Sequence, residues 1–483
     1  MRYITKKDLY IVAQYHGKIM QGIGLVILLP IIVSLIYQEH ATYLGFIIPS
    51  LISLGLGTLL TKINAKHGRV RLKHAMIVSS LAWLWGTFVG ALVMYICLGM
   101  PFIDAFFENM SAWTGTGFTM FTNVEILPHS ILFLRSLEQW VGGLGIVIIM
   151  IGVLIHSGTA ASRLYKSEAR EERIKPSVAN TLKKIFQIYL IYTAIGIILF
   201  VIAGMPIFDA VNHTFTALST GGMSIKNANM GYYHNDIFYC ISMLMMIIGA
   251  TSFLTHYKMI KTRGRSIFKD AQFIVFITLI ILSTIVIVAA TKVMPMEVLY
   301  HVVSGITTTG ANIDSSVQMA AWPGFMKIII IVLMIIGGTA GSTAGGIKII
   351  RVIAVLKGIY KNITNIISPE GRVVNIKISN RELKDSSIRE AGSYVSLYLV
   401  FLLLGWLVLV FYGYDAIDSL LDMSSAQSTV GLTTGIMGPA MPLGAKLMTI
   451  FNMWIGRLEI IPVLIVFRSI IEIFKVKSPK KAF

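Results

Sequence analysis

Charged residues are scarce in this chain of 483 residues: Asp, Glu, Lys and Arg together make up 13%, whereas hydrophobic residues make up 55%. An ordinary soluble domain carries about 25% charged residues, so this balance excludes one and indicates a protein embedded in a membrane. The chain also lacks any polar segment long enough to form a separate soluble domain.

Cysteine is nearly absent as well. Cys97 and Cys240 both lie inside apolar runs, so the sequence indicates neither a disulfide framework nor a cysteine metal site. The ten histidines show neither HExxH spacing nor a partnered nucleophile. A membrane enzyme that uses His213 or His301 is therefore the weakest interpretation, and we expect no enzyme activity and no organic cofactor.

Long apolar runs, by contrast, are abundant. Ten of them are about long enough to cross a bilayer as a helix, which takes about 20 residues. Because open sheet edges are not tolerated in lipid, the pattern predicts an all-α membrane protein. The runs lie near residues 19–37, 43–60, 75–98, 129–156, 185–204, 237–255, 271–290, 325–347, 394–413 and 447–471.

Acidic residues are fewer than basic ones, 23 against 41, which gives a formal net charge of +18. Their placement argues against a nucleic-acid partner, because 35 of the 41 basic residues lie in six segments on one side of the predicted spans. This bias predicts that both termini are cytoplasmic, in the inner membrane, with anionic membrane lipids as partners of the basic side. No signal peptide is evident, because the first apolar run is long and another follows at once. The six segments are the N-terminus, 61–74, 157–184, 257–270, 348–389 and 468–481.

Four short segments between the apolar runs resemble one another. Each has an acid thirteen residues before a glycine, and a hydroxyl residue both three and six residues before that glycine. The acid fits the first turn of a short helix, where it caps the helix or complements its dipole. The segments are Asp104–Phe118, Asp209–Met223, Glu297–Ala311 and Asp418–Leu432. Their final strips are Thr114-Gly115-Thr116-Gly117, Ser219-Thr220-Gly221-Gly222, Thr307-Thr308-Thr309-Gly310 and Ser428-Thr429-Val430-Gly431.

Strips of this composition suit an ion pore. A monovalent cation that leaves water needs a replacement shell of oxygens, which carbonyls and hydroxyls supply without a fixed charge. Glycine permits the backbone angles that point successive carbonyls the same way. Small residues also recur where membrane helices pack closely, but four strips in register between spans favour a pore. We therefore predict two leading transmembrane helices (1–72) and four pseudo-repeated helix–pore loop–helix units around one central pore. The units are 73–179, 180–267, 268–389 and 390–483.

Small residues also interrupt the second helix of the third unit. Ten residues of Gly, Ala, Ser and Thr propagate a helix poorly, and non-helical backbone at membrane depth is tolerated where it lines a wet cavity. This predicts a gating loop below the strips, with close helix packing as the alternative. The loop is not a phosphate-binding loop, because Ile347 stands between Gly346 and Lys348 and no Ser or Thr follows. The predicted gate residues of the loop are Gly337, Gly338, Gly341, Gly345, Gly346 and Lys348.

Arg457 lies deep inside the last apolar run, about sixteen residues after Met441 or roughly 24 Å along a helix. An intramembrane arginine is functional by default and usually faces a polar interior. We therefore assign Arg457 to the gate, where it would repel or meter a cation. Pairing with Glu459 is the alternative.

These features together resemble the Trk/Ktr/HKT superfamily of potassium transporters over essentially the whole chain, and the leading helix pair resembles its TrkH type. Three further segments carry the resemblance: RSLEQWVGGLGIV (Arg135–Val147), GGTAGSTAGGIK (Gly337–Lys348) and WIGRLEI (Trp454–Ile460).

The resemblance implies potassium uptake through a selectivity filter lined by the four motif glycines. Related proteins with serine in place of the first of these glycines prefer sodium, so Gly117 implies potassium. Family members are homodimers regulated by a cytosolic nucleotide-binding partner of the TrkA type. The alternatives are a potassium-translocating subunit of an ATP-driven pump and a cation-coupled symporter. The positions expected to bind K⁺ are Thr116, Gly221, Thr309 and Val430.

Overall fold

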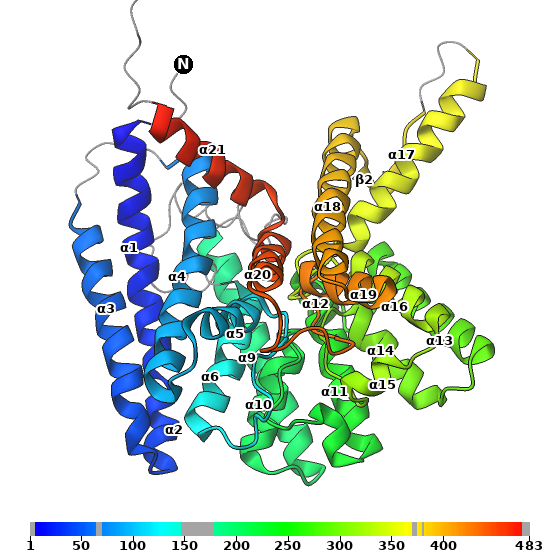
Figure 1. Cartoon of the computed structure of the whole chain (residues 1–483). Coiled ribbons are helices and arrows are strands. Elements are labelled where there is room, and N and C mark those ends of the chain that lie inside the picture. Colours follow the sequence, from blue (N-terminus) through cyan, green and yellow to red (C-terminus); the bar gives the residue numbers. More distant parts are fainter. Residues whose placement is uncertain (1–4, 64–69, 146–177, 370–373, 379–380, 476–483) are drawn as a thin grey trace, which may run out of the picture. The chain divides into compact units, whose positions relative to one another are not determined.

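The structure is a computed structural model that describes residues 5–63, 70–145, 178–369, 374–378 and 381–475. It is mostly helical, and its elements form two compact units (Figure 1). Unit 1 comprises Met1–Thr114, Ile126–Gln187 and Leu458–Phe483. Unit 2 comprises Gly115–Glu125 and Ile188–Arg457. The predicted division into a leading pair and four pore units follows different boundaries and stays a prediction.

Unit 1 is a group of long helices around α4. Helix α4 packs against α1, α3, α5 and α21, and α1 packs along α3. The α1–α3 contact is close because Gly17 faces Gly57: a Cβ added to Gly17 would lie 2.7 Å from the Gly57 carbonyl oxygen. The elements are α1 (Lys6–Leu28), α2 (Pro30–Ile36), η1 (His40–Thr42), α3 (Tyr43–Thr61), α4 (Leu72–Leu98), α5 (Phe102–Thr114), α6 (His129–Leu144), the first part of α9 (Val178–Ile202) and α21 (Ile461–Lys475).

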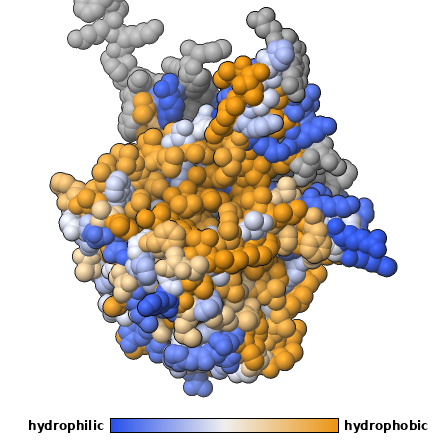
Figure 2. Space-filling model, turned by 90° about the vertical axis from the view of Figure 1, so that its right-hand side faces the viewer, coloured by the Kyte–Doolittle hydropathy of each residue, from blue (hydrophilic) through white to orange (hydrophobic). Residues whose placement is uncertain are grey.

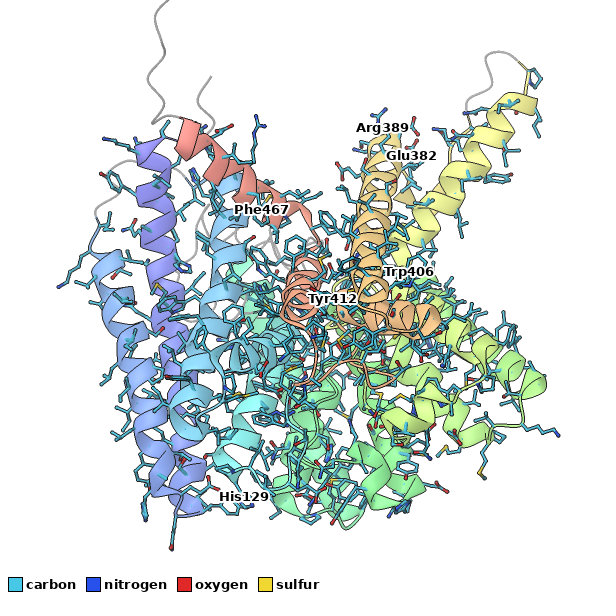
Figure 3. The ribbon with its side chains drawn as sticks, viewed as in Figure 1. His129, Glu382, Arg389, Trp406, Tyr412 and Phe467 are labelled. Carbon is cyan, nitrogen blue, oxygen red and sulfur yellow. The ribbon has the colours of Figure 1, made fainter. Side chains whose placement is uncertain are left out.

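The start of α6 is anchored by Glu39. Its carboxylate accepts hydrogen bonds from the backbone N–H of His129 at 2.6 Å and of Ser130 at 3.0 Å, two of the unpaired donors at a helix N-terminus. Burial raises the pKa of Glu39, but the bonds from Ser130 and His129 outweigh it and leave the pKa below its usual value. His129 is the first residue of α6 (Figure 3), and its ring stacks on Tyr37. This contact fixes the helix that carries Arg135.

Unit 2 contains the remaining helices. Packed pairs include α10 with α11, α13 with α14, α14 with α16, α16 with α19, and α17 with α18. The elements are the rest of α9, α10 (Ile207–Leu218), η2 (Asn229–Tyr233), α11 (Asp236–Gly249), α12 (Phe253–Lys261), η3 (Ile267–Lys269), α13 (Ala271–Ala290), α14 (Pro295–Ile306), α15 (Ser316–Ala320), α16 (Gly324–Ile336), α17 (Ile349–Ile367), β1 (Lys377–Ile378), β2 (Arg381–Glu382), α18 (Asp385–Phe411), α19 (Ala416–Gln427) and α20 (Leu443–Leu458). The two short strands pair antiparallel, with Lys377 opposite Glu382.

Within the described residues, six helices are long and apolar enough to cross a membrane, or up to eight if two bent helix pairs each count as one span. Much of their apolar surface is exposed, and on the face in Figure 2 apolar residues form a broad band above a hydrophilic lower edge. On α13 the exposed apolar side chains are Ile274, Ile281, Leu282, Ile285 and Val286. Part of the predicted span 129–156 falls outside the described residues.

Helix breaks are more frequent than the sequence predicted. The expected break is present, because α16 ends at Ile336 and α17 begins at Ile349. The apolar run 237–255 was predicted as one span, yet α11 and α12 meet at a bend of 98°. The run 447–471 is also interrupted, at Glu459 and Ile460, whose φ angles are +60° and +64°. Each of these two candidate spans is therefore a bent pair of helices.

Candidate functional site

Each of the four strips follows directly from a short helix. Helices α10, α14 and α19 of unit 2 end immediately before Ser219, Thr307 and Ser428, which take helical φ angles as their C-caps. In unit 1, α5 ends at Thr114 itself. The predicted acids lie in the first turn of each helix, where they complement the dipole, although none of them is the N-cap residue.

The strip backbone is left-handed at two positions in every strip. The motif glycines Gly117, Gly222, Gly310 and Gly431 have φ angles of +96°, +71°, +77° and +105°. Two residues earlier the φ angle is positive again, and the residues there are Gly115, Thr220, Thr308 and Thr429. Threonine is β-branched and disfavours this region, so these three threonines hold a strained conformation that the surrounding contacts must maintain.

The four strips meet in a closed ring inside unit 2. Because a motif glycine has no side chain, the carbonyl of the residue before the next glycine can approach it closely. A Cβ added to Gly117 would lie 2.5 Å from the Gly221 carbonyl oxygen, and one added at any of the other three would overlap a carbonyl oxygen outright. The pairs in order are Gly117 with Gly221, Gly222 with Thr309, Gly310 with Val430, and Gly431 with Thr116. The predicted cation-binding positions Thr116, Gly221, Thr309 and Val430 are therefore brought together.

Hydroxyl residues ahead of the strips hold their backbone. Ser425 Oγ accepts a hydrogen bond from Gly431 N at 2.9 Å, and Ser304 Oγ donates one to the Ala311 carbonyl at 2.6 Å. The backbone carbonyls of Thr216, Ser304 and Ser425 also accept from strip N–H groups at 2.8–2.9 Å. The hydroxyl residue six positions before each of these glycines thus has a structural role at the strip.

The small-residue loop between α16 and α17 contacts the strips from within unit 2. Gly345 N donates to Thr308 Oγ1 at 2.6 Å, and Thr220 Oγ1 donates to Thr343 Oγ1 at 3.2 Å. A Cβ added to Gly345 would overlap the Ser428 carbonyl oxygen, which explains why glycine occupies this position. The strained threonines of three strips therefore face this loop.

The same loop is tied to the bend between α11 and α12 and to Arg457. Thr339 N and Thr343 N donate to the carbonyls of Ala250 and Gly249, each at 3.1 Å. Arg457 donates to the Thr343 carbonyl at 2.8 Å. The Lys348 ammonium donates to the Ala344 carbonyl. These contacts bring together the predicted gate residues of the loop and Arg457.

The acids at the starts of the short helices have different partners. Asp209 accepts a hydrogen bond from Tyr233 OH at 2.7 Å, and Asp418 forms an ion pair with Lys327 at 2.5 Å. Partial burial and the neighbouring Asp314 carboxyl raise the pKa of Glu297 to about 7. Because the three partners differ in charge, the acids do not form one common ligand set.

A comparison with known proteins identifies the family to which this chain belongs. The family model for TrkH, described as a cation transport protein, matches residues 45–313 and 271–476. The chain belongs to the TrkH family of cation transport proteins. It is therefore a multi-pass membrane transporter and not a member of an enzyme family, as the sequence predicted.

Individual TrkH-family proteins match along nearly their whole length. An uncharacterized cation transporter of Methanocaldococcus jannaschii is 40% identical, over 97% of both chains. The Trk system potassium uptake protein TrkH of Escherichia coli K12 is 29% identical, over 91% of this chain and 94% of that protein. The crystal structure of the potassium transporter TrkH from Vibrio parahaemolyticus superposes with a TM-score of 0.83 at 26% identity, and covers 95% of this chain and 98% of that one.

In this TrkH-family chain, sequence reasoning missed several residues at the strips. Thr343 was not singled out, although it joins Thr220, Gly249 and Arg457. The left-handed conformation of the three threonines was not predicted either, because nothing in a threonine's local sequence favours it. One signal in the sequence could have indicated it: the first strip has a glycine, Gly115, at the position two residues before its motif glycine, where the other strips have these threonines.

Proposed function

We propose that this chain carries potassium into the cell as the membrane subunit of a Trk-type uptake system. The carbonyl oxygens of Thr116, Gly221, Thr309 and Val430 would form its selectivity filter and bind K⁺ after it loses water. The observation that supports this most strongly is the closed ring in which each motif glycine faces one of these four carbonyls.

The chemistry of the ring suits a weakly held monovalent cation. Val430 has a hydrocarbon side chain, so only its backbone carbonyl can contact an ion at that position. The four positions then offer equivalent neutral oxygens despite their different side chains, and neutral oxygens let the ion leave again. Potassium as the cargo is further supported by the potassium uptake proteins and the potassium transporter structure that the chain resembles.

The loop between α16 and α17 and Arg457 would form the gate of this pathway. Its hydrogen bonds to Thr308 and Thr220 hold it against the strips, and the Arg457 guanidinium adds a positive charge at the same loop. A cation passing this point must displace the loop or overcome that charge.

The proposed setting is the inner membrane, with both termini in the cytoplasm. Within unit 1 the start of α1 and the end of α21 lie at the same end (Figure 1). In unit 2, Arg389 lies near one end of α18 and Tyr412 just beyond the other (Figure 3). The basic ends would face anionic lipid and a cytosolic nucleotide-binding partner of the TrkA type, and two copies would form a homodimer.

The test is tracer flux of rubidium and of sodium into liposomes that hold only the purified chain, with and without an inward-negative diffusion potential. Rubidium uptake driven by the potential alone, in excess of sodium uptake, is the expected result. Uptake only with an added proton or sodium gradient would favour a symporter. No uptake with this chain alone, restored when an ATP-hydrolysing partner is added to the liposomes, would favour a pump subunit.

A further inference from the structure

Three helices of unit 1 meet at a fully buried polar cluster next to the first strip, and none of its residues belongs to a strip. Helix α4 contributes Gly86 and Gly90, α5 contributes Asn109 and Trp113, and α6 contributes Glu138. A Cβ added to Gly86 would touch the Trp113 indole at 3.2 Å, and one added to Gly90 would overlap both Asn109 Oδ1 and Glu138 Oε1. The two glycines thus leave space for these polar side chains.

An ion pair between Arg135 and Glu108 lies beside this polar cluster. Arg135 Nε donates to Glu108 Oε1 at 2.8 Å, and the two side chains are 2% and 0% exposed. Among the described residues, Glu108 and Arg135 are the charged groups that act on Glu138, and α4 carries no titratable side chain between His74 and Tyr95. An ionised Glu138 would give this buried cluster one surplus negative charge, which is unfavourable away from water.

The side-chain donor close to Glu138 is the Trp113 indole N–H, which is too weak to offset the burial of a charge. Among the described residues neither of its carboxyl oxygens has a hydrogen-bond partner, and the same holds for Asn109 Oδ1 and Trp113 Nε1. The orientation of the Asn109 amide is fixed, because its Nδ2 donates to the Ala105 carbonyl at 2.7 Å. Turning the amide over would remove this bond and the one that Nδ2 donates to the Met94 sulfur at 3.1 Å, and would place Oδ1 against both acceptors. Two acceptors, Asn109 Oδ1 and Glu138 Oε1, therefore lie side by side.

We propose that Glu138 binds a proton in the folded protein and donates it to Asn109 Oδ1. One proton then resolves the whole cluster: Asn109 gains a donor, the second oxygen of Glu138 is free to accept from the nearby Trp113 indole N–H, and the charges of Glu108 and Arg135 balance. Glu138 is thus a proton-binding site outside the strips.

The site is a positioning element for the first strip, and this part rests on the proposed function. Trp113 directly precedes Thr114, and its carbonyl packs against α6 so closely that a Cβ on Gly142 would overlap it. The neutral carboxyl of Glu138, which accepts from the Trp113 indole, would add a second contact to the residue from which the strip begins.

The proton can be tested without any transport measurement. Infrared difference spectra of the detergent-purified full chain and its E138Q variant should show the carbonyl stretching band of a protonated carboxylic acid, lost on substitution. E138Q should keep the wild-type unfolding midpoint within about 2 °C at neutral pH, because an amide also donates to Asn109. E138A should lower it by about 5 °C or more, since it leaves Asn109 unpaired and opens a cavity.

The pH dependence of folding stability gives an independent test of the bound proton. Above the ordinary range for glutamate, the folded wild type would bind one more proton than the unfolded chain, so its stability should fall as the pH rises, relative to E138Q. The matched control is E108Q, which removes the Glu108 carboxylate from its ion pair with the buried Arg135 and should destabilise strongly. The proposal is overturned if E138Q loses no protonated-acid band and is as damaging as E138A, whatever the flux measurements give.

Discussion

At the scale of single residues, the ring of four strips requires glycine at each motif position. Gly310 has a φ of +77°, and a side chain there would overlap the Val430 carbonyl oxygen. The Gly310→Ser variant must therefore displace the third strip from its neighbour. We expect the rubidium-to-sodium flux ratio to fall about tenfold, which corresponds to about 1.4 kcal/mol of lost discrimination.

Gly305 provides a matched control five residues earlier on α14. A Cβ there would make ordinary contacts, the nearest at 3.5 Å from Ile330. The Gly305→Ser variant should keep both its expression and its ion selectivity. An unchanged flux ratio in Gly310→Ser, with normal folding, would remove the third strip from the proposed filter.

The same residues show how far sequence reasoning reaches. The four motif glycines could be found by their spacing, because backbone that turns left-handed selects glycine directly. The threonines at 220, 308 and 429 could not, since a β-branched residue disfavours the conformation they adopt. Their contacts with Thr343 and Gly345 come from a loop distant in sequence.

At the scale of helices, the composition of the sequence predicted where helices occur better than where they break. The four short helices were expected from their leading acids, and each observed helix begins two residues before its acid. The bend after Gly249 was missed because run 237–255 contains no charged residue and no proline, although Thr251 and Ser252 stand at the break. At this bend the carbonyls of Gly249 and Ala250 have no partner within a helix. They accept hydrogen bonds from Thr343 and Thr339 of the loop between α16 and α17. A tertiary contact, which hydropathy does not register, thus stabilises the break.

A substitution on α20 that weakens its contact with this loop should alter the rate of transport. Arg457→Ala removes both a positive charge and the hydrogen bond to the Thr343 carbonyl. Since a hydrogen bond to a charged group contributes roughly 1.5–3 kcal/mol, the docked loop should open more often and rubidium flux should rise several-fold. Arg457→Lys, which keeps the charge, should raise it less.

Folding must be followed alongside, by size-exclusion chromatography and thermal unfolding of each variant. Normal folding with unchanged or reduced flux in Arg457→Ala would contradict the gate assignment. A protein that fails to fold would instead assign Arg457 a structural role, and the conservative lysine variant then shows whether the charge alone restores the fold.

At the scale of the whole molecule, the charge distribution implies one orientation in the membrane. Basic residues gather in the segments proposed to be cytoplasmic, whereas the strip-bearing loops hold few. The prediction can be checked with two positions in unit 2 that are equally accessible: Val317 on α15 and Phe268 on η3 are each 77% exposed. Equal exposure means that a difference in labelling reports the side of the membrane and not burial.

Single-cysteine variants Val317→Cys and Phe268→Cys, made in a background with Cys97→Ala and Cys240→Ala, would be treated with a membrane-impermeant maleimide. In intact cells the reagent should label Val317→Cys alone, and in inverted vesicles Phe268→Cys alone. The exchanged pattern, with Phe268→Cys labelled in intact cells and Val317→Cys in inverted vesicles, would rule out the orientation in which the strips open outward. Potassium would then meet the loop between α16 and α17 before the carbonyl ring, and the proposed order of filter and gate along the uptake path would have to be reversed.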